Sequence, residues 1–189
     1  SLMGLTVHIG SQIEEITPFE ESFKVLRKLV GELLKMNCKI KSLDLGGGIG
    51  INYNGDFYFP LQKYAKLVEK YFSDLSVEII LEPGRFLVGS AGILVSSVIR
   101  KKIGAEKKFI ILDSGMNNFL RPSLYNAYHK ILPVTKENVQ SCKFDIVGPI
   151  CESGDIFARN VQMQDLKKDD LVVICSVGAY GSCMSSNYN

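Results

Sequence analysis

Apolar residues recur at helical spacing in two stretches of the chain. In residues 17–37, TPFEESFKVLRKLVGELLKMN, Thr17 is expected to be the N-cap, Pro18 the first helical residue and Glu20 the partner that closes a capping box. A second amphipathic helix, in the stretch FPLQKYAKLVEKYFSDL, is expected to start at Pro60. The expected buried faces are Phe19, Phe23, Leu26, Val30, Leu33 and Leu34 in the first helix, and Leu61, Tyr64, Leu67, Val68 and Tyr71 in the second.

Three apolar runs beside these helices are too short for typical helices and rich in Val, Ile and Leu: LTVHIGS (5–11), KSLDLGGG (41–48) and VEIILEPGR (77–85). They are expected to be buried parallel strands, because strands that alternate with helices are typical of a β/α fold. Each run ends in polar or glycine residues. Ligands bind at the carboxyl ends of parallel strands, so the three ends are expected to face one pocket.

The pattern changes after Gly92. The runs GILVSSVIRKKI, KKFIILDSG, CKFDIVGPI and DDLVVICSVG read as strands separated by turns, with one short helix expected near SLYNAYHKI. We therefore expect an α/β part over residues 1–92 and a mostly antiparallel β domain over residues 93–189.

Composition and charge remove several classes of function. The 189 residues are 46% hydrophobic and carry 22 basic against 20 acidic side chains, a formal charge of +2, so neither nucleic acid nor an anionic membrane is an expected partner. No apolar run approaches the ~20 residues that span a bilayer, and the first residues lack a signal-peptide layout. Five cysteines without a C-x-x-C pair indicate reduced thiols and a cytoplasmic location, and no metal site is expected.

Candidate chemistry lies where the expected strands end. The GGGIG run at residues 46–50 could bring backbone N–H groups to a phosphate or could be a tight turn, and its spacing is not that of a dinucleotide fingerprint. In EPGR, Glu82 and Arg85 could be a functional pair or a surface ion pair. His8, near Ser11, could stack on a ring, contact phosphate or be a structural histidine.

The second half adds four candidates. Arg121 and Tyr125, one helical turn apart, could bind a carboxylate, the alternative being a solvated arginine and a core tyrosine. Cys151 could act as an acid beside Glu152, which could hold an amine, or could be a buried inert thiol. Tyr180 in GAYG could reach a ligand oxygen or be a turn residue. Together the candidates suit pyridoxal phosphate, whose ring accepts electrons while a carboxylate keeps its nitrogen protonated.

Six motifs in order, HIGSQ, GGGIG, EPGR, DSGMNNFLRPSLYNAYH, CESGD and GAYGSCMSSNYN, resemble those of the diaminopimelate decarboxylases. The resemblance implies the C-terminal portion of a (β/α)8 barrel that binds pyridoxal 5'-phosphate, followed by a mostly antiparallel β domain. It also implies a head-to-tail homodimer with a shared active site. The implied reaction converts meso-2,6-diaminopimelate to L-lysine and CO2, the last step of lysine biosynthesis.

The same resemblance assigns roles to individual residues. His8 would stack on the pyridine ring, Glu82 would pair with its nitrogen, and Cys151 of the partner subunit's loop would be the proton donor. The cofactor phosphate would be held near Ser11 by Gly46, Gly47, Gly48, the segment Glu82, Pro83, Gly84 and Arg85, and Tyr180. The amino-acid substrate would be held by Arg85, Arg121, Tyr125, Glu152 and Tyr180, with the arginines on its distal carboxylate and Glu152 on its distal amine.

The chain departs from the family pattern at both ends, since the Schiff-base lysine that the family carries before HIGSQ and the closing strands after MSSNYN are absent. Lys66 is an unsuitable substitute because its helical position is on a solvated face. We therefore expect a fragment truncated at both ends. Two alternatives remain. One is an ornithine or arginine decarboxylase, which Glu152 disfavours because the ornithine decarboxylases resemble Cys-Asp at the position of Cys151 and Glu152. The other is a non-catalytic remnant or regulatory subunit.

Overall fold

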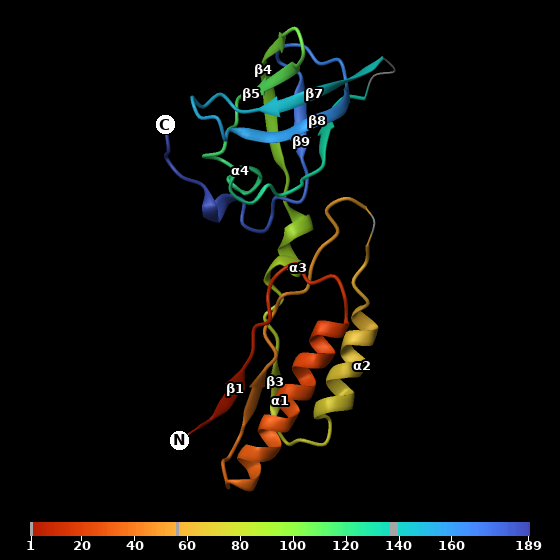
Figure 1. The fold of residues 1–189 in the computed structure, drawn as a ribbon, viewed down its shortest axis with the longest axis vertical. Coiled ribbons are helices and arrows are strands. Elements are labelled where there is room, and N and C mark those ends of the chain that lie inside the picture. Colours follow the sequence, from red (N-terminus) through yellow and green to blue (C-terminus); the bar gives the residue numbers. More distant parts are fainter. Residues whose placement is uncertain (1, 56, 137–139) are drawn as a thin grey trace. The chain divides into compact units, whose positions relative to one another are not determined.

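The structure, a computed structural model, describes residues 2–55, 57–136 and 140–189 (Figure 1). The chain divides into two compact units, residues 1–52 with 56–87 and residues 53–55 with 88–189. Each unit is described by itself. The expected domain boundary between residues 92 and 93 stays a prediction.

The first unit alternates strands and helices, as predicted. Its strands run parallel in the order β1-β2-β3, with Leu5, Leu43 and Ile79 in register. The elements are β1 (Gly4–Thr6), α1 (Thr17–Lys35), β2 (Ser42–Asp44), α2 (Leu61–Phe72), β3 (Glu78–Ile80) and the short α3 (Gly84–Val88) after β3. The three parallel strands and the two amphipathic helices are thereby confirmed.

The core of the first unit is mainly aromatic. Phe23 of α1 is 1% exposed and packs edge-to-face on Tyr64 and Phe72 of α2, with ring centroids 5.7 and 5.4 Å apart. The predicted faces are too wide at their ends, because Leu34 and Leu61 are exposed. We expected all three strands to be buried. Leu43 of the central strand β2 is buried, whereas β1 and β3 form the edges of the sheet and are partly exposed.

The predicted capping box of α1 is wrong. The N-cap is Ile16, which makes no side-chain capping hydrogen bond, and Thr17 is the first helical residue. Glu20 instead accepts hydrogen bonds from Lys70 Nζ (2.8 Å) and Tyr71 Oη (2.9 Å) of α2. The Lys70 hydrogen bond, followed by that of Tyr71, lowers the pKa of the Glu20 carboxyl. The carboxylate that could have capped its own helix therefore ties the two helices together.

The second unit is a six-stranded sheet of order β6-β9-β4-β5-β7-β8, antiparallel except for the parallel β5–β7 pair. Its edge strands β6 and β8 contact each other, so the sheet is curled into a nearly closed barrel. This confirms the mostly antiparallel β domain. The strands are β4 (Leu94–Ile103), β5 (Lys108–Leu112), β6 (Ile131–Pro133), β7 (Ser141–Val147), β8 (Ile156–Gln164) and β9 (Leu171–Ile174).

The sequence pattern missed β6 and β8. In β8 the apolar alternation is broken at Asn160, which has a φ of +54° and donates its N–H to buried Asp145 at 2.8 Å, opposite an irregularity between Phe144 and Ile146 of β7. The expected short helix is present but earlier than predicted. This helix, α4 (Arg121–Tyr125), begins at Arg121 and ends where Asn126 turns left-handed.

The glycine run holds the three strand ends of the first unit against one another. A Cβ atom on Gly46 (φ +69°) would overlap the carbonyl oxygen of Val7 after β1, and one on Gly47 would overlap that of Glu82 after β3. On Gly48 (φ +96°) it would lie 2.5 Å from the carbonyl oxygen of Gly10. Only glycine permits this backbone approach.

The close approach gives a test of stability. Gly47→Ala forces the loops after β2 and β3 apart, so we expect it to lower the free energy of unfolding by about 1–3 kcal/mol in urea titrations. The matched control is Gly31→Ala in α1, where a Cβ meets nothing within 4 Å and alanine raises helix propensity, a gain of up to about 1 kcal/mol. Equal effects of the two variants would contradict the proposed contact.

Candidate functional site

The predicted groups of the first unit meet at the carboxyl ends of its strands. The Glu82 N–H donates to the Gly46 carbonyl oxygen at 2.8 Å, and Arg85 Nη2 donates to Ser11 Oγ at 3.1 Å. His8 is exposed, and its Cα lies 3.4 Å from the position that a Cβ atom would occupy if Gly46 had a side chain. The structure therefore brings the HIGSQ, GGGIG and EPGR motifs together, as predicted.

The glycine run presents backbone donors in this cluster. The Gly46 N–H donates to Asp44 Oδ1 at 2.9 Å, and the Gly48 carbonyl oxygen accepts the Ile13 N–H. Within the described part of the chain, no acceptor is assigned to the N–H groups of Gly47 and Gly48. Adjacent backbone N–H groups in a glycine run suit an anion of phosphate size.

Two residues that brace this cluster were missed by sequence reasoning. Asp44 binds the Gly46 N–H, and Gln12 (φ +58°) pairs with the Ile51 backbone, donating from Nε2 at 2.6 Å and accepting at Oε1 at 3.2 Å. Both follow or end a strand, and a carboxylate or amide there can satisfy neighbouring backbone groups. Their position at or just after the end of a strand is the sequence signal that could have identified these two residues.

Arg121 is the most distinctive group of the second unit. It is 7% exposed, which rejects the alternative of a solvated arginine. Its guanidinium carbon lies 5.7, 5.9 and 5.8 Å from the ring centroids of Tyr53, Tyr125 and Tyr180. Aromatic faces attract a cation, so the three tyrosines stabilise the buried charge. Of the predicted residues, Arg121, Tyr125 and Tyr180 are thus brought together.

His129 was quoted within a motif but given no role, and it completes the surroundings of Arg121. It is 2% exposed and accepts a hydrogen bond from Arg121 Nε to its Nε2 at 3.4 Å. Its Nδ1 lies 2.9 Å from the Cys175 carbonyl oxygen. Phe119 and Tyr53 contact the imidazole edge-to-face, at 4.6 and 4.9 Å.

Tyr180 has a backbone conformation unusual for a tyrosine, with a φ of +59°. A large side chain in the left-handed region is uncommon, and such outliers cluster at functional sites. A Cβ on the flanking Gly181 would overlap the Val177 carbonyl oxygen. The GAYG segment therefore places the Tyr180 ring beside Arg121 at some cost in backbone energy.

Cys151 and Glu152 lie on a separate, exposed loop. Its geometry depends on Asp155, which is 3% exposed and accepts the Met116 N–H at Oδ1 (2.7 Å) and the Ile150 N–H at Oδ2 (2.8 Å). Glu152 Oε1 accepts the Gly154 N–H at 3.2 Å. Exposure rejects the alternative of a buried inert thiol for Cys151.

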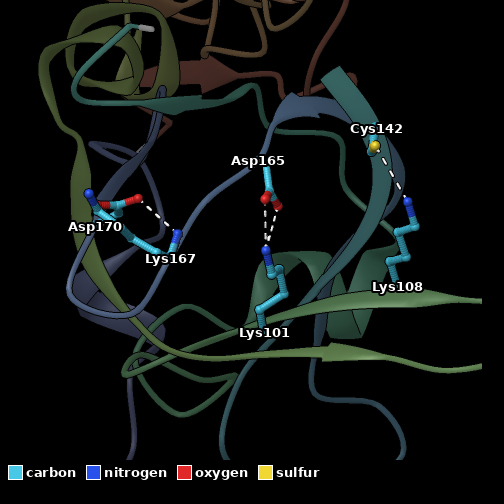
Figure 2. Close-up of polar contacts among 6 residues, drawn as sticks. All are labelled: Lys101, Lys108, Cys142, Asp165, Lys167 and Asp170. Atoms are coloured by element: carbon cyan, nitrogen blue, oxygen red, sulfur yellow. Dashed lines mark hydrogen bonds and ion pairs between the residues drawn. The ribbon is translucent and has the colours of Figure 1, made fainter. Parts of the chain in front are cut away.

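Two cavities of the second unit differ in their relation to these residues. One, of about 840 Å³, is lined by His129 and neighbouring residues, by Ser153 and Gly154 beside the Cys151 loop, and by β8. Another, of about 470 Å³, contains no predicted site residue. Figure 2 shows its polar contacts: Lys101 pairs with Asp165 at 2.7 Å, and Lys108 Nζ lies 3.4 Å from Cys142 Sγ. No predicted site residue lines this second cavity, so it is not part of the candidate site.

The five cysteines are all free, as predicted. Among the residues that the structure describes, no group of three or more His, Cys, Asp or Glu side chains could hold a metal ion. In the same residues no helix has the length and apolar character needed to cross a membrane. The candidate groups are therefore backbone donors, a carboxylate, a histidine and an arginine in the first unit, and an arginine, tyrosines, a histidine, a thiol and a carboxylate in the second.

Comparison with known proteins gives a consistent result. Diaminopimelate decarboxylase of Zymomonas mobilis is 43% identical over 190 residues, covering all of this chain and 45% of the relative. The crystal structure of diaminopimelate decarboxylase from Helicobacter pylori complexed with L-lysine matches with a TM-score of 0.94 at 38% identity, covering 99% of this chain and 46% of that one. The chain thus spans about half the length of the relatives it matches.

More distant relatives share the fold. The crystal structure of lysine/ornithine decarboxylase complexed with cadaverine from Vibrio vulnificus matches with a TM-score of 0.91 at 25% identity, covering all of this chain and 51% of that one. The family model described as pyridoxal-dependent decarboxylase, C-terminal sheet domain, matches residues 21–178. This chain belongs to the pyridoxal-dependent decarboxylase family.

Proposed function

We propose that residues 1–189 carry the phosphate-binding and substrate-binding groups of a longer diaminopimelate decarboxylase. The whole protein would release CO2 from meso-2,6-diaminopimelate and form L-lysine, the last step of lysine biosynthesis. Identities of 43% and 38% to the Zymomonas mobilis and Helicobacter pylori proteins of that name, against 25% to the Vibrio vulnificus lysine/ornithine decarboxylase, favour this substrate over ornithine. The lysine that anchors the cofactor would lie outside these residues.

Arg121 is the observation that carries the substrate assignment. Diaminopimelate has a second carboxylate that ornithine lacks, and a fixed guanidinium is the group that best recognises one. Three tyrosine rings and His129 hold Arg121 in a buried position. Tyr125 and Tyr180 are exposed beside it and can present their hydroxyl groups to the same ligand. Arg85 would add a second cation to that carboxylate.

The cluster at the strand ends fits the cofactor. The Gly47 and Gly48 N–H groups would bind the phosphate, with Gly46, Ser11, the Glu82 to Arg85 segment and the Tyr180 hydroxyl around it. His8 would stack on the ring, and the Glu82 carboxylate would hold a proton on the ring nitrogen. When bound, pyridoxal phosphate supplies the electron sink for the charge left on carbon by CO2 loss.

The exposed loop of Cys151 would complete the site of a second subunit in a homodimer. The Cys151 thiol would donate the proton that replaces CO2 on carbon, and Glu152 would bind the distal amine of the substrate. Exposure of both residues on a loop braced by Asp155 supports this role, because a group donated to a partner must project from its own fold. The free cysteines support a cytoplasmic location.

The activity is tested by CO2 release from the full-length protein loaded with pyridoxal phosphate. We expect release from meso-2,6-diaminopimelate in preference to L-ornithine. Arg121→Lys keeps the charge but loses the planar fork, so we expect KM for diaminopimelate to rise roughly 10- to 100-fold. Arg100→Lys, at an exposed position of β4, is the matched control and should leave KM unchanged.

Two results would contradict the proposed function. Faster release from ornithine would indicate the ornithine type of decarboxylase. No release from any amino acid by the loaded protein would indicate a non-catalytic member of the family.

Sharing of the site between subunits is tested by mixing two inactive variants. Cys151→Ser removes the proposed proton donor, and Arg121→Gln removes the guanidinium that would bind the substrate carboxylate. If each site takes Cys151 from one subunit and Arg121 from the other, half of the dimers are mixed and each has one intact site. About a quarter of the wild-type activity should then return. No recovery in verified mixed dimers would place both residues in the site of one chain.

A further inference from the structure

The hydrogen bonds of His129 define which of its nitrogens carries the proton. Arg121 Nε can only donate, so His129 Nε2, 3.4 Å away, must accept. The imidazole is then neutral with its proton on Nδ1, which donates to the Cys175 carbonyl oxygen at 2.9 Å. Cys175 lies directly after β9, and its own N–H donates to the Lys130 carbonyl oxygen at 2.9 Å. The ring is therefore attached to the barrel on one side and to Arg121 on the other.

Packing leaves this imidazole little freedom. Phe119, which is fully buried, contacts the ring edge-to-face at an interplanar angle of 85°, and Tyr53 does so at 73°. Tyr53 also faces the guanidinium of Arg121. Rotation of the histidine would break its hydrogen bond to the backbone, and rotation of Arg121 about its last bonds would break the Nε bond to the histidine.

From these contacts we propose that His129 is a positioning residue that sets the specificity of the site for substrates with a distal carboxylate. The inference rests on the proposed function. A guanidinium is planar, so fixing the direction of Nε fixes the direction in which the Nη groups point. His129 thus acts through Arg121 and has no need to touch the substrate. Its loss should weaken ligands that have the carboxylate and spare those that lack it.

L-Lysine and cadaverine form a matched pair of probes. Diaminopimelate loses one of its two carboxylates, so L-lysine keeps the distal one, whereas cadaverine has the same chain and amines without it. Dissociation constants of both are measured by titration calorimetry on the full-length, cofactor-loaded protein, so that the readout is independent of turnover. Circular dichroism melting of each variant reports the fold.

Two substitutions separate the two hydrogen bonds of the imidazole. In His129→Asn the amide can still donate to the Cys175 carbonyl oxygen, but the shorter side chain does not reach Arg121 Nε. In His129→Gln the amide oxygen can take the place of Nε2. Tyr128→Phe, at an exposed neighbouring position, is the control.

We expect His129→Asn to weaken L-lysine binding roughly 10- to 100-fold, which is the range for a lost hydrogen bond to a charged group, and cadaverine binding less than about twofold. His129→Gln should stay within about fivefold of wild type for both ligands. Equal weakening of L-lysine and cadaverine by His129→Asn would overturn the inference in favour of a purely structural role, and so would no weakening of either. A wild-type protein that binds neither ligand would overturn the proposed function, and the inference with it.

Discussion

Backbone contact at Gly46–Gly48 is the constraint on which the rest of the first unit depends. The carbonyl oxygens of Val7, Glu82 and Gly10 occupy the space that side chains would need there. The backbones of the loops after β1, β2 and β3 are consequently in direct contact, and the side chains on these loops become neighbours. Because the three residues are glycines, no side chain of their own covers their backbone donors. The fold and the proposed phosphate site thus share one physical cause.

In the second unit the corresponding problem is a buried cation. Burying a guanidinium is costly unless its donors are bound and its charge is balanced. Arg121 is held by the neutral nitrogen of His129 and by the faces of three tyrosines. Hydrogen bonding to a neutral nitrogen and contact with aromatic faces do not neutralise the guanidinium charge. A guanidinium fixed in this way is well suited to binding a substrate carboxylate.

The sequence predicted those features that depend on local pattern. The parallel strands, both amphipathic helices and the glycine run follow from periodicity and residue type, and the site motifs lie where strands end. The predicted capping box is absent because Glu20 instead binds Lys70 and Tyr71, some fifty residues away in the sequence. Strand β8 was not predicted because its alternation of apolar and polar residues is broken at Asn160. The Asn160 N–H forms a hydrogen bond with Asp145 of the neighbouring strand β7, which the local sequence does not indicate. The role of His129 depends on Cys175, 46 positions later, and has no local signal.

The central claim is that the first unit binds phosphate through backbone donors and the second unit binds a carboxylate through Arg121. A crystal structure of the full-length protein with pyridoxal phosphate and L-lysine tests both parts at once. We predict phosphate oxygens within hydrogen-bonding distance of the Gly47 and Gly48 N–H groups, and the lysine carboxylate on the Arg121 guanidinium. A phosphate bound away from the glycine run, or a carboxylate that does not contact Arg121, would contradict the account.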